Sequence, residues 1–215
     1  MKSSILIAAL LVLPLPALAA QPPAAVPGAA KMKPDAGKES WTYRKDGLNL
    51  KSYDKIIIDP TAIYHGKDAQ FEDVNAADQA KFAQLVTQSV QEEVAKKMEI
   101  ARAAGPGTLR LKITLLGAEA TKTGVATATR VLPFGMAMNA YKELKGKPGS
   151  YTGSLLFAVT LSDAKSGEVL VAAIRRKSPS AMDIPATLST VDTVKAVAHD
   201  IGKEIAEKLD QARGR

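Results

Sequence analysis

The chain of 215 residues contains no cysteine. It therefore has no disulfides, with which many exported domains supplement a small core, and no thiol that could act as a nucleophile or metal ligand. A lipidated cysteine is also missing after the apolar N-terminal segment, where Ala20 and Gln21 stand. The sequence predicts a mature chain without a lipid anchor, stabilised by apolar burial alone.

Histidine is nearly as scarce, since His65 and His199 are the only two. Neither lies in a motif with metal-ligand spacing, and the chain has no Gly-x-Ser-x-Gly elbow and no phosphate-binding glycine loop. The sequence therefore predicts a protein that is not an enzyme and that uses no cofactor and no metal.

Long apolar runs are also few, and the longest is Ile5 to Leu13. Nine helical residues reach about 14 Å, well short of the roughly 30 Å hydrocarbon core of a bilayer. With Lys2 before the run and the small residues Ala17 to Ala19 after it, the segment is typical of a secretory signal peptide. We expect a signal peptide over residues 1–19, cleaved near Ala19/Ala20, a periplasmic location, and no transmembrane anchor in the mature chain.

Residues 20–40 contain four prolines among alanines, glycines and lysines, without apolar periodicity. Such a segment buries too little surface to offset its ordering entropy, which predicts a flexible Pro/Ala-rich leader. The remaining residues 41–215 fit the usual length of one domain.

Apolar periodicity predicts a strand, a helix and a second strand in the first half of this domain. Tyr53 to Asp59 is β-branched and apolar on successive positions, which predicts an interior strand with both faces covered. From Ala76 to Met98 the apolar side chains recur every three or four residues, with Asn75 as N-cap. Leu109 to Leu115 alternates with polar residues as a strand with one wet face does. This order predicts a right-handed crossover between parallel strands.

The second half predicts a hairpin and a C-terminal helix. Ser154 to Leu161 and Val169 to Ile174 are β-prone runs joined by a short polar loop. Val194 to Leu209 carries a helical stripe that begins behind Ser189. The sequence predicts an α+β, two-layer fold with a mixed four- to five-stranded sheet and two long helices, in the order βαβ(β)ββα, where the bracketed strand is optional.

Four of these stretches also carry a family resemblance: Tyr53 to Pro60, Gly107 to Leu111, Tyr151 to Gly153, and Ser166 to Leu170. From about Tyr43 onward the chain resembles a bacterial envelope lipoprotein family known as domain of unknown function 3313. The resemblance implies a Gram-negative envelope protein and supplies no catalytic residues. The chain departs from the lipoprotein members by lacking the lipidated cysteine.

The segment 117–149 permits two interpretations. Phe134 and Met136 belong to an apolar, methionine-bearing stretch. Such a stretch either packs on the core or acts as a flap that docks a partner, because methionine suits adaptable surfaces.

A basic run and an acidic loop are the other candidate sites. Arg175, Arg176 and Lys177 end the last predicted strand, and with lysines of the preceding loop they form either an anion-binding sheet edge or a solvated edge that discourages aggregation. Asp59 ends the first strand and Tyr64 follows it in an acidic loop. Asp59 is either one carboxylate of an acid pair or an organiser of the turn before Pro60.

Three functions remain. The first is a non-catalytic periplasmic accessory or adaptor protein that docks an envelope protein. The second is an anion-recognition module for envelope polymers or lipids, favoured by the net charge of +7. The third is a carboxylate-dependent hydrolase centred on Asp59. In an exported protein the positive charge does not indicate nucleic acid as a partner.

Overall fold

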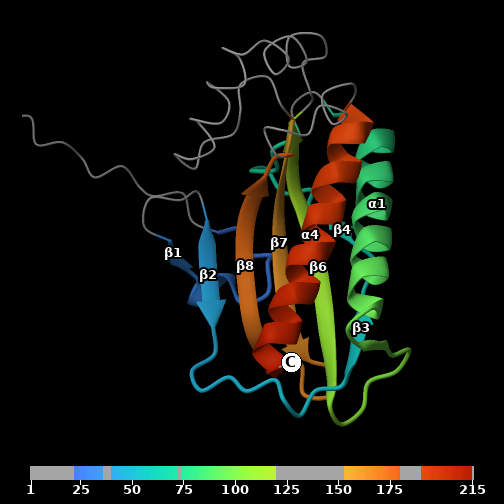
Figure 1. The fold of residues 1–215 in the computed structure, drawn as a ribbon. Helices are drawn as coiled ribbons and strands as arrows, with labels where there is room; N and C mark the ends of the chain where they lie inside the picture. Colours follow the sequence, from blue (N-terminus) through green and yellow to red (C-terminus); the bar gives the residue numbers. More distant parts are fainter. Residues whose placement is uncertain (1–21, 36–39, 72–73, 120–152, 180–189, 215) are drawn as a thin grey trace, which may run out of the picture.

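The computed structural model describes residues 22–35, 40–71, 74–119, 153–179 and 190–214. Within them a mixed sheet forms one layer, and two long helices, α1 (Ala76–Ala95) and α4 (Thr190–Arg213), form a second layer on one of its faces (Figure 1). The predicted signal peptide, Phe134, Met136 and the expected cap Ser189 lie outside the described residues.

The sheet has the strand order β1-β2-β8-β7-β6-β3-β5, with β4 pairing β6 off this path. The strands are β1 (Lys33–Pro34), β2 (Trp41–Arg44), β3 (Lys55–Ile58), β4 (Ala62–Ile63), β5 (Glu99–Ile100), β6 (Thr108–Glu119), β7 (Ser154–Asp163) and β8 (Val169–Lys177). β3 runs parallel to β5 and β6, β4 runs parallel to β6, and the other neighbours are antiparallel. The predicted α+β class, the parallel crossover and the β7–β8 hairpin are confirmed.

The sheet has eight strands among the described residues, because the short strands β1, β2, β4 and β5 join the predicted ones. Two details of the sheet differ from the prediction. β2 was not foreseen, and it extends the sheet beyond β8 by pairing with residues 171–174 of that strand. β3 lies between β6 and the two-residue β5, and its burial alternates: Ile56 and Ile58 are buried, whereas Ile57 is half-exposed. The expectation that both faces of β3 are covered is therefore wrong, because the helices cover only one side of this strand.

Helix α1 forms because its apolar side chains make one stripe and its first turn is capped. The Asn75 side chain accepts a hydrogen bond of 3.0 Å from the backbone N–H of Asp78. Phe82, Val86 and Val90 are buried against the sheet and α4. The helix ends at Ala95, three residues before the predicted end.

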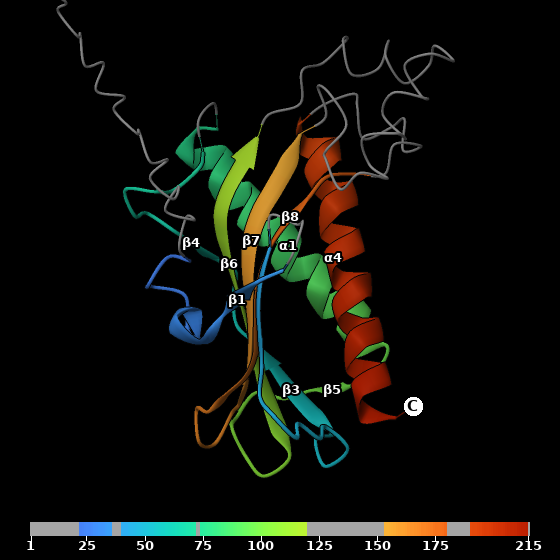
Figure 2. The ribbon, with the colours of Figure 1, turned by 90° about the vertical axis from the view of Figure 1, so that its left-hand side faces the viewer.

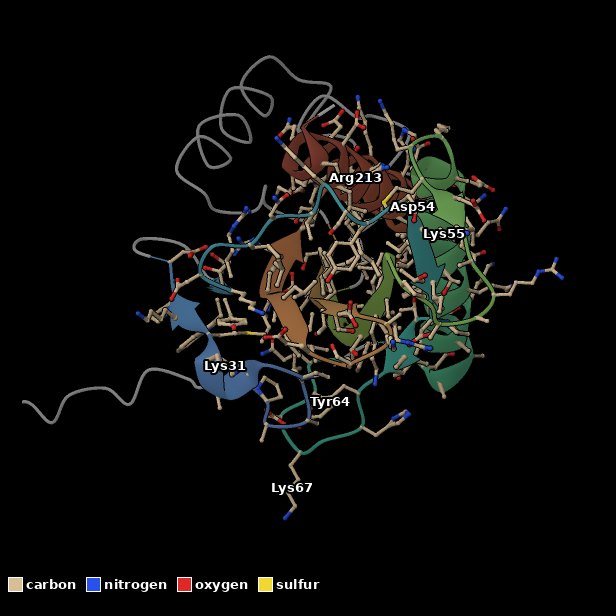
Figure 3. The ribbon with its side chains drawn as sticks, turned by 90° about the horizontal axis from the view of Figure 1, so that it is seen from below. Lys31, Asp54, Lys55, Tyr64, Lys67 and Arg213 are labelled. Atoms are coloured by element: carbon tan, nitrogen blue, oxygen red, sulfur yellow. The ribbon has the colours of Figure 1, made fainter. Side chains whose placement is uncertain are left out.

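Helix α4 packs beside α1 and is fixed at its C-terminal end by a buried arginine. The guanidinium of Arg213 donates to the backbone oxygens of Tyr53 and Lys97, each at 3.0 Å. The bond to Lys97 reaches the segment just after α1, and the bond to Tyr53 reaches the approach to β3. Figure 3 shows Arg213 beside Asp54 and Lys55 at this lower end of the molecule.

The N-terminal segment covers part of the other face of the sheet (Figure 2). Val26, Ala29 and Met32 are buried against Ala172, Ile174 and neighbouring side chains; we call these residues the back cluster. The expectation of a flexible leader over residues 20–40 is therefore wrong for residues 22–35. A few isolated apolar side chains are enough to hold this segment in place, because the sheet already offers an apolar surface. Turns also shape the chain locally: the backbone N–H of Val26 donates to the carbonyl of Pro23 at 2.9 Å.

Candidate functional site

A groove runs between α4 and the part of the sheet that the helices leave uncovered. In Figure 1, α4 passes over β7 and β6, whereas β8 and β2 lie to one side of it. The groove has a volume of about 700 Å³ and is lined by β2, β7 and β8 on one side and by α4 on the other. We call it the α4 groove.

The floor of the groove follows from the strand register. Thr42 of β2 pairs with Ala173 of β8, and Ala173 pairs with Val159 of β7. Because alanine and threonine have small side chains, these three paired residues leave unfilled space above the sheet. Ile205 and Leu209 of α4 form the opposite wall. The interior is therefore apolar, although it is reached directly from the surface.

The rim of the groove is mostly cationic. Among the described residues that line it, five are basic, and Glu204 is the one acid. The basic residues are Arg44, Arg175, Arg176, Lys177 and Lys208. Glu204 accepts hydrogen bonds from Lys177, at 3.2 Å, and from Lys208. Burial of Glu204 opposes its ionisation, but the bond and the charge of Lys208, with those of Lys177, lower the pKa of this carboxyl below its ordinary value.

The predicted basic run contributes to this rim. Arg175, Arg176 and Lys177 pair with Phe157, Leu156 and Leu155 of β7, and they lie beyond residues 171–174 of β8, which pair with β2. Arg175 donates to Asp35 at 2.8 Å, and Arg176 donates to Glu119 at 3.0 Å. Lys177 donates to Glu204. Each of the three cations already has a carboxylate partner, which reduces its attraction for an external polymer.

The hydrogen bonds of Asp35 tie the back of the sheet to the groove. Its carboxylate accepts from the Thr42 and Ser40 hydroxyls, at 2.7 and 2.8 Å, as well as from Arg175. The bond from Thr42, then that from Ser40 and the charge of Arg175 lower the pKa of Asp35. The N-terminal segment thereby holds Arg175, a rim residue, in place.

Asp59 and Tyr64 have separate partners. Arg110 donates to Asp59 at 2.6 Å, and the hydroxyl of Tyr64 donates to Asp68 at 2.7 Å, which raises the pKa of Tyr64. Tyr64 packs against the back cluster, and Figure 3 shows it on the side of the sheet away from α4. Within the described part of the chain, no three His, Asp or Glu side chains gather in a way that could hold a metal ion.

Sequence reasoning found Arg175, Arg176 and Lys177 but missed Arg44 and Ala173. The alternation of Trp41 and Tyr43 with smaller or polar residues was a signal for β2. This signal is weak because β2 has only four residues and follows the proline-rich segment.

The chain belongs to the family described as protein of unknown function (DUF3313), whose model matches residues 28–205. This confirms the resemblance found in the sequence. No curated protein matches the chain. Within the described ranges, no helix combines the length and apolarity needed to cross a bilayer.

Several solved structures are similar to the chain at a low level. The PelC dodecamer from Paraburkholderia phytofirmans is 12% identical, with 75% of this chain and 96% of that chain covered and a TM-score of 0.39. A DUF4136 family protein from Bacteroides thetaiotaomicron is 9% identical, with 82% and 98% covered and a TM-score of 0.39. A DUF330 protein from Xanthomonas campestris is 10% identical, with 79% and 90% covered and a TM-score of 0.40. Similarities at this level assign no function to the chain.

Proposed function

We propose that the protein is an exported, non-catalytic accessory protein of the bacterial envelope, located in the periplasm, and that it acts by binding a ligand in the α4 groove. The observation that carries this proposal is the groove itself. Its volume of about 700 Å³ lies within the range of roughly 300 to 1,000 Å³ that is usual for ligand pockets. An apolar interior with a few polar groups at its rim is also the usual composition of such sites.

The chemistry of the groove supports binding rather than catalysis. Glu204 is the acid that lines it among the described residues, and Lys177 and Lys208 keep this carboxyl ionised. A carboxylate with a lowered pKa and two cationic partners is a poor general base. The hydrolase alternative has less support, because the carboxylate of Asp59 is bound to Arg110.

The binding function is tested with N-phenyl-1-naphthylamine, an uncharged apolar dye that fluoresces when it leaves water. We expect the mature protein to bind the dye and the variant Ala173→Leu to bind it about tenfold more weakly, because the larger side chain fills the floor of the groove. Ala103→Leu, which adds the same bulk at an exposed loop position outside the groove, is the matched control. Absence of binding, or equal loss in both variants, contradicts the proposal.

The export function is tested separately by expressing the whole chain in a Gram-negative bacterium. We expect the protein in the fraction released by osmotic shock, with an N-terminus at or near Ala20 by mass spectrometry. An uncleaved chain that stays with the cytoplasmic fraction contradicts export, and this outcome is independent of the dye measurement.

A further inference from the structure

We propose that the ligand of the α4 groove is a single-chain amphiphile with an anionic headgroup, and that Arg44 binds this headgroup. The inference rests on the proposed binding function of the groove and adds the chemical class of the ligand. It follows from which rim cations are already paired, from where Arg44 stands in the strand register, and from the size of the groove.

Arg44 differs from the other rim cations in its partners. Arg175 is bound to Asp35, and Lys177 and Lys208 share Glu204. Arg44 is exposed at the end of β2 and forms no ion pair with any residue that the structure describes. An anion that binds Arg44 therefore breaks no existing pair, whereas an anion at the other cations competes with a carboxylate. The planar guanidinium also suits a carboxylate or phosphate through two parallel hydrogen bonds.

The apolar floor begins next to Arg44. This residue pairs with Val171, which pairs with Leu161, and the next row of the same face contains Ala173. On the neighbouring strand β7 the same face continues with Leu161, Val159 and Phe157, which extend over about 13 Å at roughly 3.3 Å per residue. An apolar chain with its charged end at Arg44 lies along these β7 residues, against the apolar wall of α4. Both ends of an amphiphile are thus accommodated.

The dimensions and the charges of the groove limit the ligand further. A volume of about 700 Å³ suits a molecule of drug size, which corresponds to one acyl chain rather than to a lipid with two. A cationic headgroup is disfavoured, because the described rim residues include five basic side chains and one acid, which would repel it. A long anionic polymer would need a row of unpaired cations, and three of the rim cations are paired by Asp35 and Glu204.

The test compares 11-(dansylamino)undecanoic acid with its methyl ester, which has the same chain but no charge. For the mature protein we expect the acid to bind about tenfold more tightly than the ester, the scale of one charge-assisted contact. Arg44→Gln should weaken binding of the acid to the level of the ester and leave the ester unchanged. Arg102→Gln removes the same charge at an exposed position away from the groove and should change neither.

The outcomes separate the two proposals. If the mature protein binds acid and ester equally well, or if Arg44→Gln has no more effect than Arg102→Gln, the headgroup assignment is overturned while binding in the groove stands. If neither probe nor the uncharged dye binds, the binding function fails as well. Recovery of acid binding by Arg44→Lys, with an unchanged melting curve, supports a direct contact with the charge.

Discussion

The substitution Gly202→Ala tests how closely α4 packs on α1. Gly202 is buried in α4, and a Cβ built there lies 2.7 Å from the backbone oxygen of Ser89 on α1. Ordinary van der Waals contact begins at 3.4 Å, so the helices have to separate by about 0.7 Å. Overpacking of this kind costs about 1 to 3 kcal/mol, and the better helix propensity of alanine returns about 1 kcal/mol. We expect Gly202→Ala to lower the free energy of unfolding by about 1 kcal/mol.

The measurement is urea unfolding followed by circular dichroism at the helix band. Gly105→Ala is the matched control, because its Cβ meets nothing closer than the Thr108 hydroxyl at 3.8 Å. This variant should be as stable as the wild type or slightly more stable, by up to about 1 kcal/mol, through a less flexible unfolded chain. If Gly202→Ala is as stable as Gly105→Ala, the backbone contact between α1 and α4 does not exist as described.

Three further predictions concern the segments that hold the groove in place. Arg213→Ala should lower the free energy of unfolding by about 2 to 3 kcal/mol in urea titrations, because the backbone oxygens of Tyr53 and Lys97 lose a charged donor that is itself buried. The exposed Arg102→Ala should be neutral, and equal effects would contradict the anchoring role. Met32→Ala should cost about 2 kcal/mol in the same assay because it opens the back cluster, and a neutral result would mean that this segment does not cover the sheet. The pKa of Asp35 is lowered in the folded state, so its contribution to stability is present above the ordinary value of 3.8 and is lost as the pH falls through the lowered pKa. Asp35→Asn should therefore be less stable than wild type at pH 7, and the difference should shrink below about pH 4; a difference independent of pH would contradict the assignment.

The helices and the central strands could be predicted because their burial is one-sided and regular. Val86 and Val90 repeat with the period of a helix that buries one stripe. Leu109 and Leu111 repeat with the period of a strand that buries one face. In both cases the pattern is local, so it does not depend on what the element packs against.

The N-terminal cover could not be predicted in the same way. Val26 and Met32 are isolated apolar residues. They are buried only because the middle of β8 is apolar on both faces: Ala172 faces the back cluster and Ala173 faces the groove. Burial of such residues is a property of the surface that receives them. The prolines around Val26 were interpreted as a sign of flexibility, whereas one of them forms a turn.

The candidate site was only partly predictable. The basic run Arg175 to Lys177 is visible in the sequence, but its pairing with Asp35 and Glu204 depends on segments far apart in the chain. The groove exists because Ala173 lies opposite Thr42, which no local pattern indicates. The docking role expected for Phe134 and Met136 stays a prediction, because these residues lie outside the described part of the chain.

The measurement that tests the central claim most directly is a methyl NMR titration of the mature protein with decanoate below its micelle concentration. If the α4 groove binds the amphiphile, the methyl signals of Val171, Ala173 and Leu209 should shift together and saturate, whereas those of Val26 and Ala172 in the back cluster should not move. Shifts centred on the back cluster, or no saturable shifts in the groove, would contradict the account.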